Sequence, residues 1–508
     1  MALQSLSFEP PIEAEDKALA APARPSAKVF ALPRAKPKIL FATSEISDFV
    51  QTGGLGAVSA SLSRALRASC DVRVVLPGYP QVLARTPSLQ VIEQLPGHAG
   101  LPPCSIAAGA TADGLALLVV LCDELYRRDG GPYADAAARD YADNDVRFAR
   151  LSLAVAEIAA RGAGGWTPDV VHLNDWPTAL AAGYLTWRGA ATPSVLTIHN
   201  LAHQGLFPAE RLGALGIPDA AFGLEGVEFH GKVSFLKAGL AYSSHVTTVS
   251  ETYAQEIVAP ARGCGLDGLL ALRAEQSRLS GVINGIEDEW DPRADRSCPY
   301  QFDPPRWKGR YADFVRGALG LSLARAPLFA FVARFAHQKG VDLLIEAAEG
   351  VVARGGQLVV VGEGEAEAEL RALTRRWPEA VAVRTPFDAR LARAVFAGAD
   401  FLLMPSRYEP CGLSQMYAQK FGALPIAHRT GGIAETVFDG KTGLLFEAPD
   451  RKSLEAAIAR AFALYQSPRE FSAMRRAAMA LDFGWSRSAK RYAELYRELN
   501  GRAGAIGG

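Results

Sequence analysis

The stretch that decides the fold is KILFATSE (Lys38–Glu45), followed by the turn TGGLG (Thr52–Gly56) and by AVSASLSRAL (57–66). The first is a short apolar run typical of a buried strand, and the last has the apolar spacing of a helix. Strand, glycine turn and helix in this order open a doubly wound α/β domain. The glycine turn is either purely structural or a contact for phosphate or sugar, because backbone amides at a helix N-terminus favour anions. The residues leave both interpretations open.

The same alternation continues through two halves of the chain. The further strands expected in the first half are DVRVVLPG (71–78), LALLVVLCDEL (115–125), DVVHLND (169–175) and SVLTIHN (194–200). A second series runs from PLFAFVAR (327–334) to LPIAHRTGG (424–432). Strands separated by helices indicate parallel sheets with right-handed crossovers. We predict an α/β fold of two Rossmann-like doubly wound domains that face a deep interdomain cleft, where ligands are expected at the carboxyl ends of strands.

The sequence predicts five parts in order. They are a disordered tail (1–36), an N-terminal Rossmann-like domain (37–286), a linker rich in Pro and Asp (287–321), a C-terminal Rossmann-like domain (322–485) and a charged amphipathic helix (486–508). The tail combines Pro, Ala, Glu and Lys without any period, which is typical of a segment that cannot form a core.

The composition excludes several classes of protein. A chain of 508 residues exceeds the ~250–300 residues of one hydrophobic core, so two large domains are expected. Lys plus Arg (54) balances Asp plus Glu (54), which argues against binding to nucleic acid or to an anionic membrane. Six cysteines without a C-x-x-C pair argue against a zinc site and a disulfide scaffold. We expect a cytoplasmic enzyme without a membrane span and without a metal.

Two segments of the second half carry candidate charged residues. Arg334 and Lys339 follow a predicted strand in ARFAHQKG, where two cations either clasp a diphosphate or lie on a solvated loop. Glu409, in SRYEPCGLSQ, follows the strand DFLLMP. A carboxylate there either accepts hydrogen bonds from sugar hydroxyls and steadies positive charge, or caps the helix that starts near Ser414. The neighbouring Cys411 is interpreted as a small buried residue rather than a nucleophile.

Further candidates follow strands elsewhere. His199 and Asp175 come at the carboxyl ends of two strands of the first half, where a packing role and a role in the site are both possible. A second glycine turn, Gly431–Gly432 in RTGGIAET, precedes a helix of the second half. Glycine turns at corresponding places in two halves are more specific than either alone. The remaining histidines form no cluster with metal-ligand spacing.

Together these segments carry a resemblance. The blocks that carry it, in order from about Lys38 to the end, include TGGLG, HLNDWPTAL (172–180), TIHNLAHQGLFP (197–208), GVINGIEDEWDP (281–292), FVARFAHQKGVDLLIEA (331–347) and PSRYEPCGLSQMYAQKFGALPIAHRTGGIAETV (405–437). The chain resembles the bacterial glycogen synthase and plant starch synthase family over all but its tail. The resemblance implies a GT-B glycosyltransferase whose terminal helix crosses back onto the first domain. It also implies transfer of glucose from ADP-glucose to the 4-hydroxyl of an α-1,4-glucan such as glycogen, with retention and without a metal or cofactor.

The resemblance also implies roles for single residues. Arg334 and Lys339 would hold the donor's phosphates, Glu409 would bind the glucose hydroxyls, and His199 would contact the sugar near its 6-hydroxyl. The Gly431–Gly432 turn would offer backbone amides. The other residues implied in substrate binding are Gln51, Gly53, Gly54, Asp175, Asn200, Asn284, Cys411, Gly412, Leu413 and Thr430.

Two departures from the family pattern bear on activity. The family opens with K-T-G-G-L-x-D, whereas this chain has Gln51 and Ala57 in place of the lysine and the aspartate. Phe387 stands where the family commonly has a tyrosine. These departures keep two alternatives open: a weakly active or inactive glucan-binding homologue that modulates a true synthase, and a GT-B enzyme that uses another nucleotide sugar.

Overall fold

The computed structural model describes residues 35–294 and 307–506. The chain divides into two units, residues 1–36 and 37–508, and all described helices and strands belong to the second. Residues 1–34 of the predicted tail and residues 295–306 of the predicted linker lie outside the described residues. Among the described helices, none combines the length and the apolar character that a bilayer crossing requires.

A nine-stranded sheet organises the first half of the chain. In order across the sheet its strands are β12 (Leu279–Gly281), β11 (His245–Thr248), β7 (Ser194–Ile198), β6 (Val170–Asn174), β1 (Lys38–Ala42), β2 (Asp71–Pro77), β5 (Ala116–Leu121), β4 (Cys104–Ala110) and β3 (Gln90–Leu95). The strands from β12 to β5 are parallel, as the sequence predicts, but β4 and β3 pair antiparallel at one edge. Only residues 111–115 join β4 to β5, and a parallel crossover needs a dozen residues or more.

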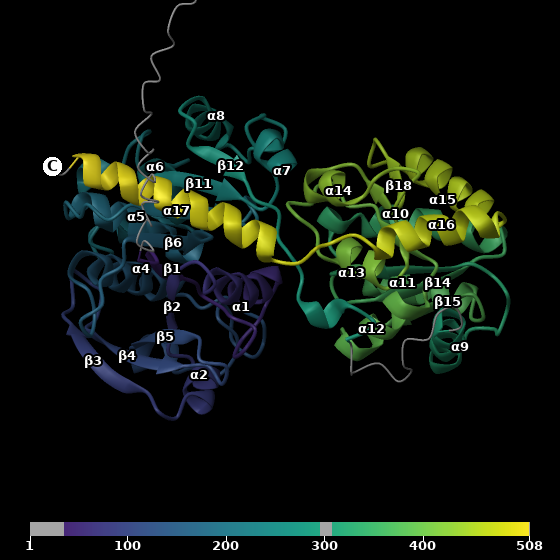
Figure 1. Cartoon of the computed structure of the whole chain (residues 1–508), viewed down its shortest axis with the longest axis horizontal. Coiled ribbons are helices and arrows are strands. Elements are labelled where there is room, and N and C mark those ends of the chain that lie inside the picture. Colours follow the sequence, from purple (N-terminus) through teal and green to yellow (C-terminus); the bar gives the residue numbers. More distant parts are fainter. Residues whose placement is uncertain (1–34, 295–306, 507–508) are drawn as a thin grey trace, which may run out of the picture. The chain divides into compact units, whose positions relative to one another are not determined.

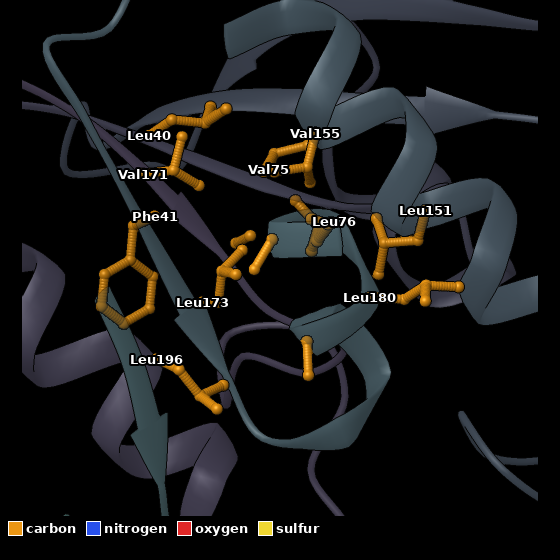
Figure 2. Close-up of a cluster of buried hydrophobic side chains, with 14 of the residues drawn as sticks. Leu40, Phe41, Val75, Leu76, Leu151, Val155, Val171, Leu173, Leu180 and Leu196 are labelled. Carbon is orange, nitrogen blue, oxygen red and sulfur yellow. The ribbon is translucent and has the colours of Figure 1, made fainter. Parts of the chain in front are cut away.

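Helices pack on this sheet and complete its core. They are α1 (Gly54–Leu66), α2 (Pro80–Arg85), α3 (Asp123–Tyr126), α4 (Asn144–Arg161), α5 (Trp176–Trp187), α6 (Phe235–Tyr242), α7 (Glu251–Glu256) and α8 (Asp267–Glu275). Figure 2 shows how leucines and valines of α4 and α5 meet those of β1, β2 and β6, for example Val155 of α4 beside Val75 of β2. A small antiparallel sheet of β8 (Leu206–Pro208), β10 (Lys232–Ser234) and β9 (Glu228–Phe229) lies outside this core sheet.

A six-stranded parallel sheet organises the second half. Its order is β15 (Val381–Arg384), β14 (Gln357–Val361), β13 (Leu328–Val332), β16 (Phe401–Met404), β17 (Leu424–His428) and β18 (Leu444–Phe446). Its helices are α9 (Trp307–Leu319), α10 (Val341–Ala353), α11 (Glu367–Arg376), α12 (Ala389–Gly398), α13 (Ser414–Lys420), α14 (Gly431–Thr436), α15 (Arg451–Tyr465) and α16 (Pro468–Met479). Phe329 and Phe331 join one buried cluster, whereas Leu328, Ala330 and Val332 join another. Both faces of the sheet are therefore covered, as parallel sheets require.

Helix α9 differs from the organisation that the sequence predicts. Its residues were assigned to the linker, yet Trp307, Tyr311 and Val315 are buried in a core of the second half. These three residues are four positions apart, which places them on one face of a helix. The sequence prediction overlooked this spacing because a Pro-rich stretch precedes it. We call the nine-stranded sheet with α1–α8 and the last helix, α17 (Ser486–Ile506), the first lobe. The six-stranded sheet with α9–α16 is the second lobe.

The last helix belongs to the first lobe's core although it ends the chain. Helix α17 lies across α1 and β6 (Figure 1) and buries Tyr492 and Tyr496. The Tyr496 hydroxyl lies 2.7 Å from Nδ1 of His172 on β6, and Nε2 of His172 lies 2.7 Å from the Thr197 hydroxyl. Burial, and then the charge of His199, lowers the pKa of His172 to about 3. His172 is therefore neutral at ordinary pH, and this polar network fixes α17 in register.

Replacing Tyr496 by phenylalanine should destabilise the first lobe. The change leaves one ring nitrogen of the fully buried His172 without its partner, which costs about 1–3 kcal/mol. Urea unfolding followed by tryptophan fluorescence measures the change. Tyr465→Phe on α15 of the second lobe is the matched control, and an equal loss in both variants would contradict a specific role for the network.

Candidate active site

The candidate residues follow the carboxyl ends of parallel strands in both lobes. Asp175 comes directly after β6 and His199 directly after β7. In the second lobe Arg334 follows β13 and Glu409 follows β16. Because parallel strands end at the same edge of a sheet, each lobe gathers its polar groups along one edge. This placement agrees with the sequence prediction, which expects ligands at the carboxyl ends of strands.

Lys339 and Glu409 form an ion pair in the second lobe. Lys339 ends the short 3-10 helix η4 (His337–Lys339), and its Nζ lies 2.5 Å from Oε2 of Glu409. The Ser406 hydroxyl donates to the same oxygen at 3.2 Å. Glu409 is only 5% exposed, so these partners offset the free-energy cost of burying its carboxylate. The sequence suggests separate roles for the lysine and the carboxylate, but it gives no sign that they are paired.

A small cavity lies beside this pair. Its volume is about 40 Å³, and Lys339, Ser406 and Glu409 line it together with Gly412 and Leu413. The structure therefore brings together four of the residues that the sequence nominates: the lysine, the glutamate and the two residues that follow Cys411. The cavity is confined to residues of the second lobe.

Arg334 is exposed at the end of β13, next to the loop that follows β7 in the first lobe. Burial, and then the positive charge of Arg334, lowers the pKa of His203 below its ordinary value. His203 belongs to the segment that begins with His199. The guanidinium of Arg334 therefore lies within electrostatic range of the loop after β7.

The glycine turn of the first lobe is held by a buried carboxylate that sequence analysis missed. Oε2 of Glu45, which is 3% exposed, accepts the backbone amides of Thr52 at 2.6 Å and Gly53 at 3.3 Å. The Tyr133 hydroxyl donates to its other oxygen at 2.9 Å. Gln51 donates its side-chain amide to the carbonyl of Gly53 at 3.0 Å. Glu45 ends the strand segment KILFATSE, and the strand-end rule could have found it.

The helix after this turn presents an uncapped N-terminus. Gly53 is the N-cap of α1 and makes no side-chain cap, and the first turn of α1 contains no acidic residue. A Cβ added to Gly54 would lie 4.0 Å from Cδ1 of Leu413, so this end of α1 approaches the loop after β16. The carboxylate of Glu45 already lies at this end of α1, bound to the amides of Thr52 and Gly53. It therefore offsets part of the helix dipole that would otherwise favour an anionic ligand.

Asp175 and His199 are joined to one another in the first lobe. Asp175 has a positive φ of 54°, which is unusual for a residue with a side chain,. This conformation lets its Oδ1 accept the backbone amide of His199 at 2.7 Å. Burial raises the pKa of Asp175 to about 7. The next residue, Asn200, also donates its backbone amide to this carboxylate.

The ring of His199 is oriented by Asn174, a second residue that sequence analysis missed. Nε2 of His199 lies 3.0 Å from Oδ1 of Asn174, whose side-chain amide donates to the carbonyl of Ala42 at 2.9 Å. Burial lowers the pKa of His199 to about 3, so the ring is neutral. Nε2 then donates to the asparagine, and Nδ1 remains as an acceptor. Like Glu45, Asn174 stands at a strand end and could have been found there.

Two nominated residues lie where the lobes meet. The thiol of Cys411 is buried in an apolar cluster with Val249, Ile286 and Met416, and burial raises its pKa to about 12. The interpretation of Cys411 as a small buried residue fits this environment, and a substrate contact through its side chain does not. Asn284 is 6% exposed and lies beside the same thiol.

The Gly431–Gly432 turn differs most from its expected role. The Gly431 amide donates to Oε1 of Glu256 at 2.9 Å, and the Thr430 hydroxyl donates to the same oxygen at 2.9 Å. The Gly432 amide donates to the backbone carbonyls of Glu409 and Pro410. In this structure protein oxygens therefore occupy the amides that the sequence assigns to a ligand, and a substrate contact there stays a prediction.

The fold and these groups define a class of protein. Two parallel Rossmann-like lobes with polar groups at the ends of their strands, among them the Lys339–Glu409 ion pair, fit the GT-B glycosyltransferases, the class that the resemblance implies. Within the described residues, no group of His, Cys, Asp and Glu could hold a metal ion.

Comparison with known proteins narrows this class. The family model "Starch synthase catalytic domain" matches residues 38–272, and "Glycosyl transferases group 1" matches residues 322–477. "Glycogen synthase 1" of Bradyrhizobium diazoefficiens is 50% identical over 459 residues, which cover 89% of this chain and 99% of that protein. "Glycogen synthase" of Pseudomonas syringae pv. syringae is 51% identical over 467 residues, which cover 91% and 96%. The chain therefore belongs to the glycogen synthase and starch synthase family.

A solved structure agrees with this assignment. The catalytic domain of Starch Synthase IV from Arabidopsis thaliana, bound to ADP and acarbose, superposes with a TM-score of 0.80 at 29% identity. The match covers 92% of this chain and 99% of that one. The two-lobed α/β fold that the sequence predicts is thereby confirmed.

Removing either cation should abolish most turnover. Arg334→Ala and Lys339→Ala should each lower kcat by at least ~10²-fold, the effect of losing one preorganised charge-stabilising group. Arg334→Ala should keep the melting temperature, because the side chain is exposed. Lys339→Ala should also lower it, because Glu409 then keeps a buried charge without its cation.

Kinetics and thermal unfolding of the two variants check both expectations. Arg460→Ala, which breaks the exposed pair with Asp439, is the control for losing an arginine. Unchanged turnover in Arg334→Ala or Lys339→Ala would assign that residue to a solvated loop.

Proposed function

We propose that this chain transfers glucose from ADP-glucose to the 4-hydroxyl at the non-reducing end of an α-1,4-glucan, with retention of configuration, as a glycogen synthase. One observation carries the proposal above the others. The identity of 50% to a glycogen synthase runs over 99% of that protein, and the family model "Glycosyl transferases group 1" matches residues 322–477, the segment that contains Arg334, Lys339 and Glu409.

The charges of the second lobe suit the cleavage step. Breaking the bond between glucose and ADP builds positive charge on the sugar and negative charge on the departing diphosphate. Arg334 and Lys339 supply fixed positive charge for the diphosphate, the task that a metal ion performs in other enzymes. The N-terminus of α1 adds little to this charge, because the carboxylate of Glu45 already binds the amides at that end of the helix,.

The ion pair with Lys339 stabilises the buried carboxylate of Glu409 in the absence of substrate. Before substrate binds, Lys339 neutralises Glu409 at 2.5 Å. We infer an exchange of partners, in which Lys339 turns to the phosphates while Glu409 accepts hydrogen bonds from the glucose hydroxyls. Each charge then keeps a partner throughout, which avoids the cost of an unpaired buried ion.

The groups of the first lobe suit a front-face mechanism. Retention requires that the incoming hydroxyl end on the face that ADP leaves. His199 is a weak base, since its pKa is lowered to about 3, and it serves better as a hydrogen-bond acceptor for a sugar hydroxyl through Nδ1. The acceptor's proton then passes to the departing phosphate oxygen itself. The bond from the 4-hydroxyl oxygen to the anomeric carbon forms as the bond to the phosphate oxygen breaks.

One assay tests the function directly. Purified full-length protein is incubated with glycogen and radiolabelled ADP-glucose or UDP-glucose, and label in the polymer is counted. We expect incorporation from ADP-glucose, with the label released as maltose by β-amylase because the new linkage is α-1,4. Incorporation from UDP-glucose alone would identify a different donor. No incorporation from either sugar would favour a glucan-binding homologue.

Restoring the family's charges at the glycine turn should raise activity. Gln51 is neutral and bonded to Gly53, so it offers the phosphates less than a lysine would. A hydrogen bond to a charged donor is worth ~1.5–3 kcal/mol and a neutral one ~0.5–1.5. Gln51→Lys with Ala57→Asp should therefore raise kcat/KM for ADP-glucose about five- to thirty-fold.

The single variant Ala57→Asp serves as the control, since it adds no cation. If the double variant is no better than a parent that is already fast, then a different cation near the turn replaces the missing lysine. If parent and double variant are both inactive, the enzyme function itself is contradicted.

A further inference from the structure

Helix α7 of the first lobe contacts α14 of the second, and a glutamate on each helix accepts hydrogen bonds from the other side of this contact. Glu256 on α7 accepts the amide of Gly431 and the hydroxyl of Thr430, both at 2.9 Å. Glu435 on α14 accepts the amide of Thr252 on α7 at 2.6 Å. Each helix thus places a carboxylate on the first turn of the other. Hydrogen bonds to an ionised acceptor are about twice as strong as neutral ones.

Of the two carboxylates, only that of Glu256 takes the place of a missing helix cap. Ser250 already caps α7, since its hydroxyl oxygen accepts the amide of Tyr253 at 3.1 Å. Thr430 is the N-cap residue of α14, but its side chain makes no cap and donates to Glu256 instead. The cap of α14 therefore comes from the other lobe. We call Ser250, Thr252 and Glu256, with their partners Pro410, Glu435 and Gly431, the seam. Each of these three pairs is joined by a hydrogen bond between the lobes.

The turn that Glu256 holds is locked to the backbone of Glu409. The amide of Gly432 lies 3.2 Å from the carbonyl oxygen of Glu409. Gly431 has a φ of 43°, and a Cβ placed on it would lie 1.9 Å from the same carbonyl oxygen. Only glycine permits so close an approach. A shift of this turn must therefore move Glu409.

A third bond ties the same loop to the first lobe. The Ser250 hydroxyl donates to the carbonyl of Pro410, the residue after Glu409, at 2.6 Å. Ser250 follows β11, and β11 pairs with β7, whose end carries His199. The position of Glu409 is thus set against the strand ends of the first lobe through bonds that touch no substrate group.

We propose that Glu256 and Glu435 are a reciprocal pair of positioning residues that fixes the Glu409 loop against the first lobe. The proposal rests on the role proposed above for Glu409. Both carboxylates accept hydrogen bonds from protein groups across the contact between α7 and α14, and their effect on the reaction passes through the turn at residues 430–432. Loss of either should disturb the chemical step more than the binding of donor or glucan.

Glu256→Ala in the full chain should lower kcat between about tenfold and about 100-fold, the scale of a displacement of about 1 Å in the site. The KM values for ADP-glucose and glycogen should change little. Glu256→Gln should restore most of the turnover, because its amide oxygen reaches the same donors. Glu256→Asp is one methylene too short and should resemble Glu256→Ala. Adding Glu435→Ala to Glu256→Ala should cost less than the product of the two single effects, because the pair acts as one unit.

Hydrogen exchange read by mass spectrometry supplies a measurement independent of turnover. In Glu256→Ala the amides of residues 430–436 should exchange faster than in the parent. Glu251→Gln is the matched control on the same helix, since its carboxylate accepts the amide of Gly281 within the first lobe. This control should keep both the parent's turnover and its exchange.

The outcomes separate the positioning role from the role of Glu409. Unchanged kcat in Glu256→Ala, or an equal fall in Glu251→Gln, would overturn the proposal. So would faster exchange at residues 430–436 without any loss of turnover. Full turnover in Glu409→Ala would instead overturn the role of Glu409, while the exchange data would still report whether Glu256 holds the turn. If Glu256→Ala fails to fold, the comparison of Glu256→Gln with Glu256→Asp decides in its place.

Discussion

Parallel strands all end at one edge of their sheet, and this constraint decides where each lobe can hold its polar groups. Asp175 and His199 follow neighbouring strands of the first lobe, as Arg334 and Glu409 follow neighbouring strands of the second. In the proposed function, each edge supplies only part of the groups for the reaction. That function therefore requires the two edges to be held in a fixed relation, and the hydrogen bonds of Ser250 and Glu256 to the second lobe are the contacts that could hold them.

The lobes divide the electrostatic work between them. The second lobe supplies formal charge, in Arg334 and in the pair of Lys339 with Glu409. The first lobe supplies hydrogen bonds from groups that burial drives towards neutrality, since the pKa of His199 falls to about 3 and that of Asp175 rises to about 7. The proposed charge-separating reaction would gain from this division, because cations at the diphosphate would face no competing cation at the sugar.

Much of the fold and part of the site could be predicted because both rest on local patterns. Strand–turn–helix order gives the two parallel sheets, and the strand-end rule finds His199 and Glu409. The pairing of Lys339 with Glu409 joins loops 70 residues apart, and no spacing rule reveals it. The contacts of the Gly431–Gly432 turn could not be predicted for a different reason, since glycines that admit a ligand and glycines that admit another backbone look alike in sequence. Only the close approach of Glu409 distinguishes them.

The docking of α17 has a consequence for how the protein is made. In chain order, the last strand of the first lobe's sheet ends at Gly281. His172 of that sheet is hydrogen-bonded to Tyr496 on α17, which comes about 200 residues after Gly281. At ~5–20 residues per second, a ribosome needs roughly 10–40 s to cover that distance. During this interval the first lobe has a complete sheet with one buried polar network open, while the second lobe emerges behind it. The polar network of the first lobe can therefore close only after the residues of the second lobe have been synthesised.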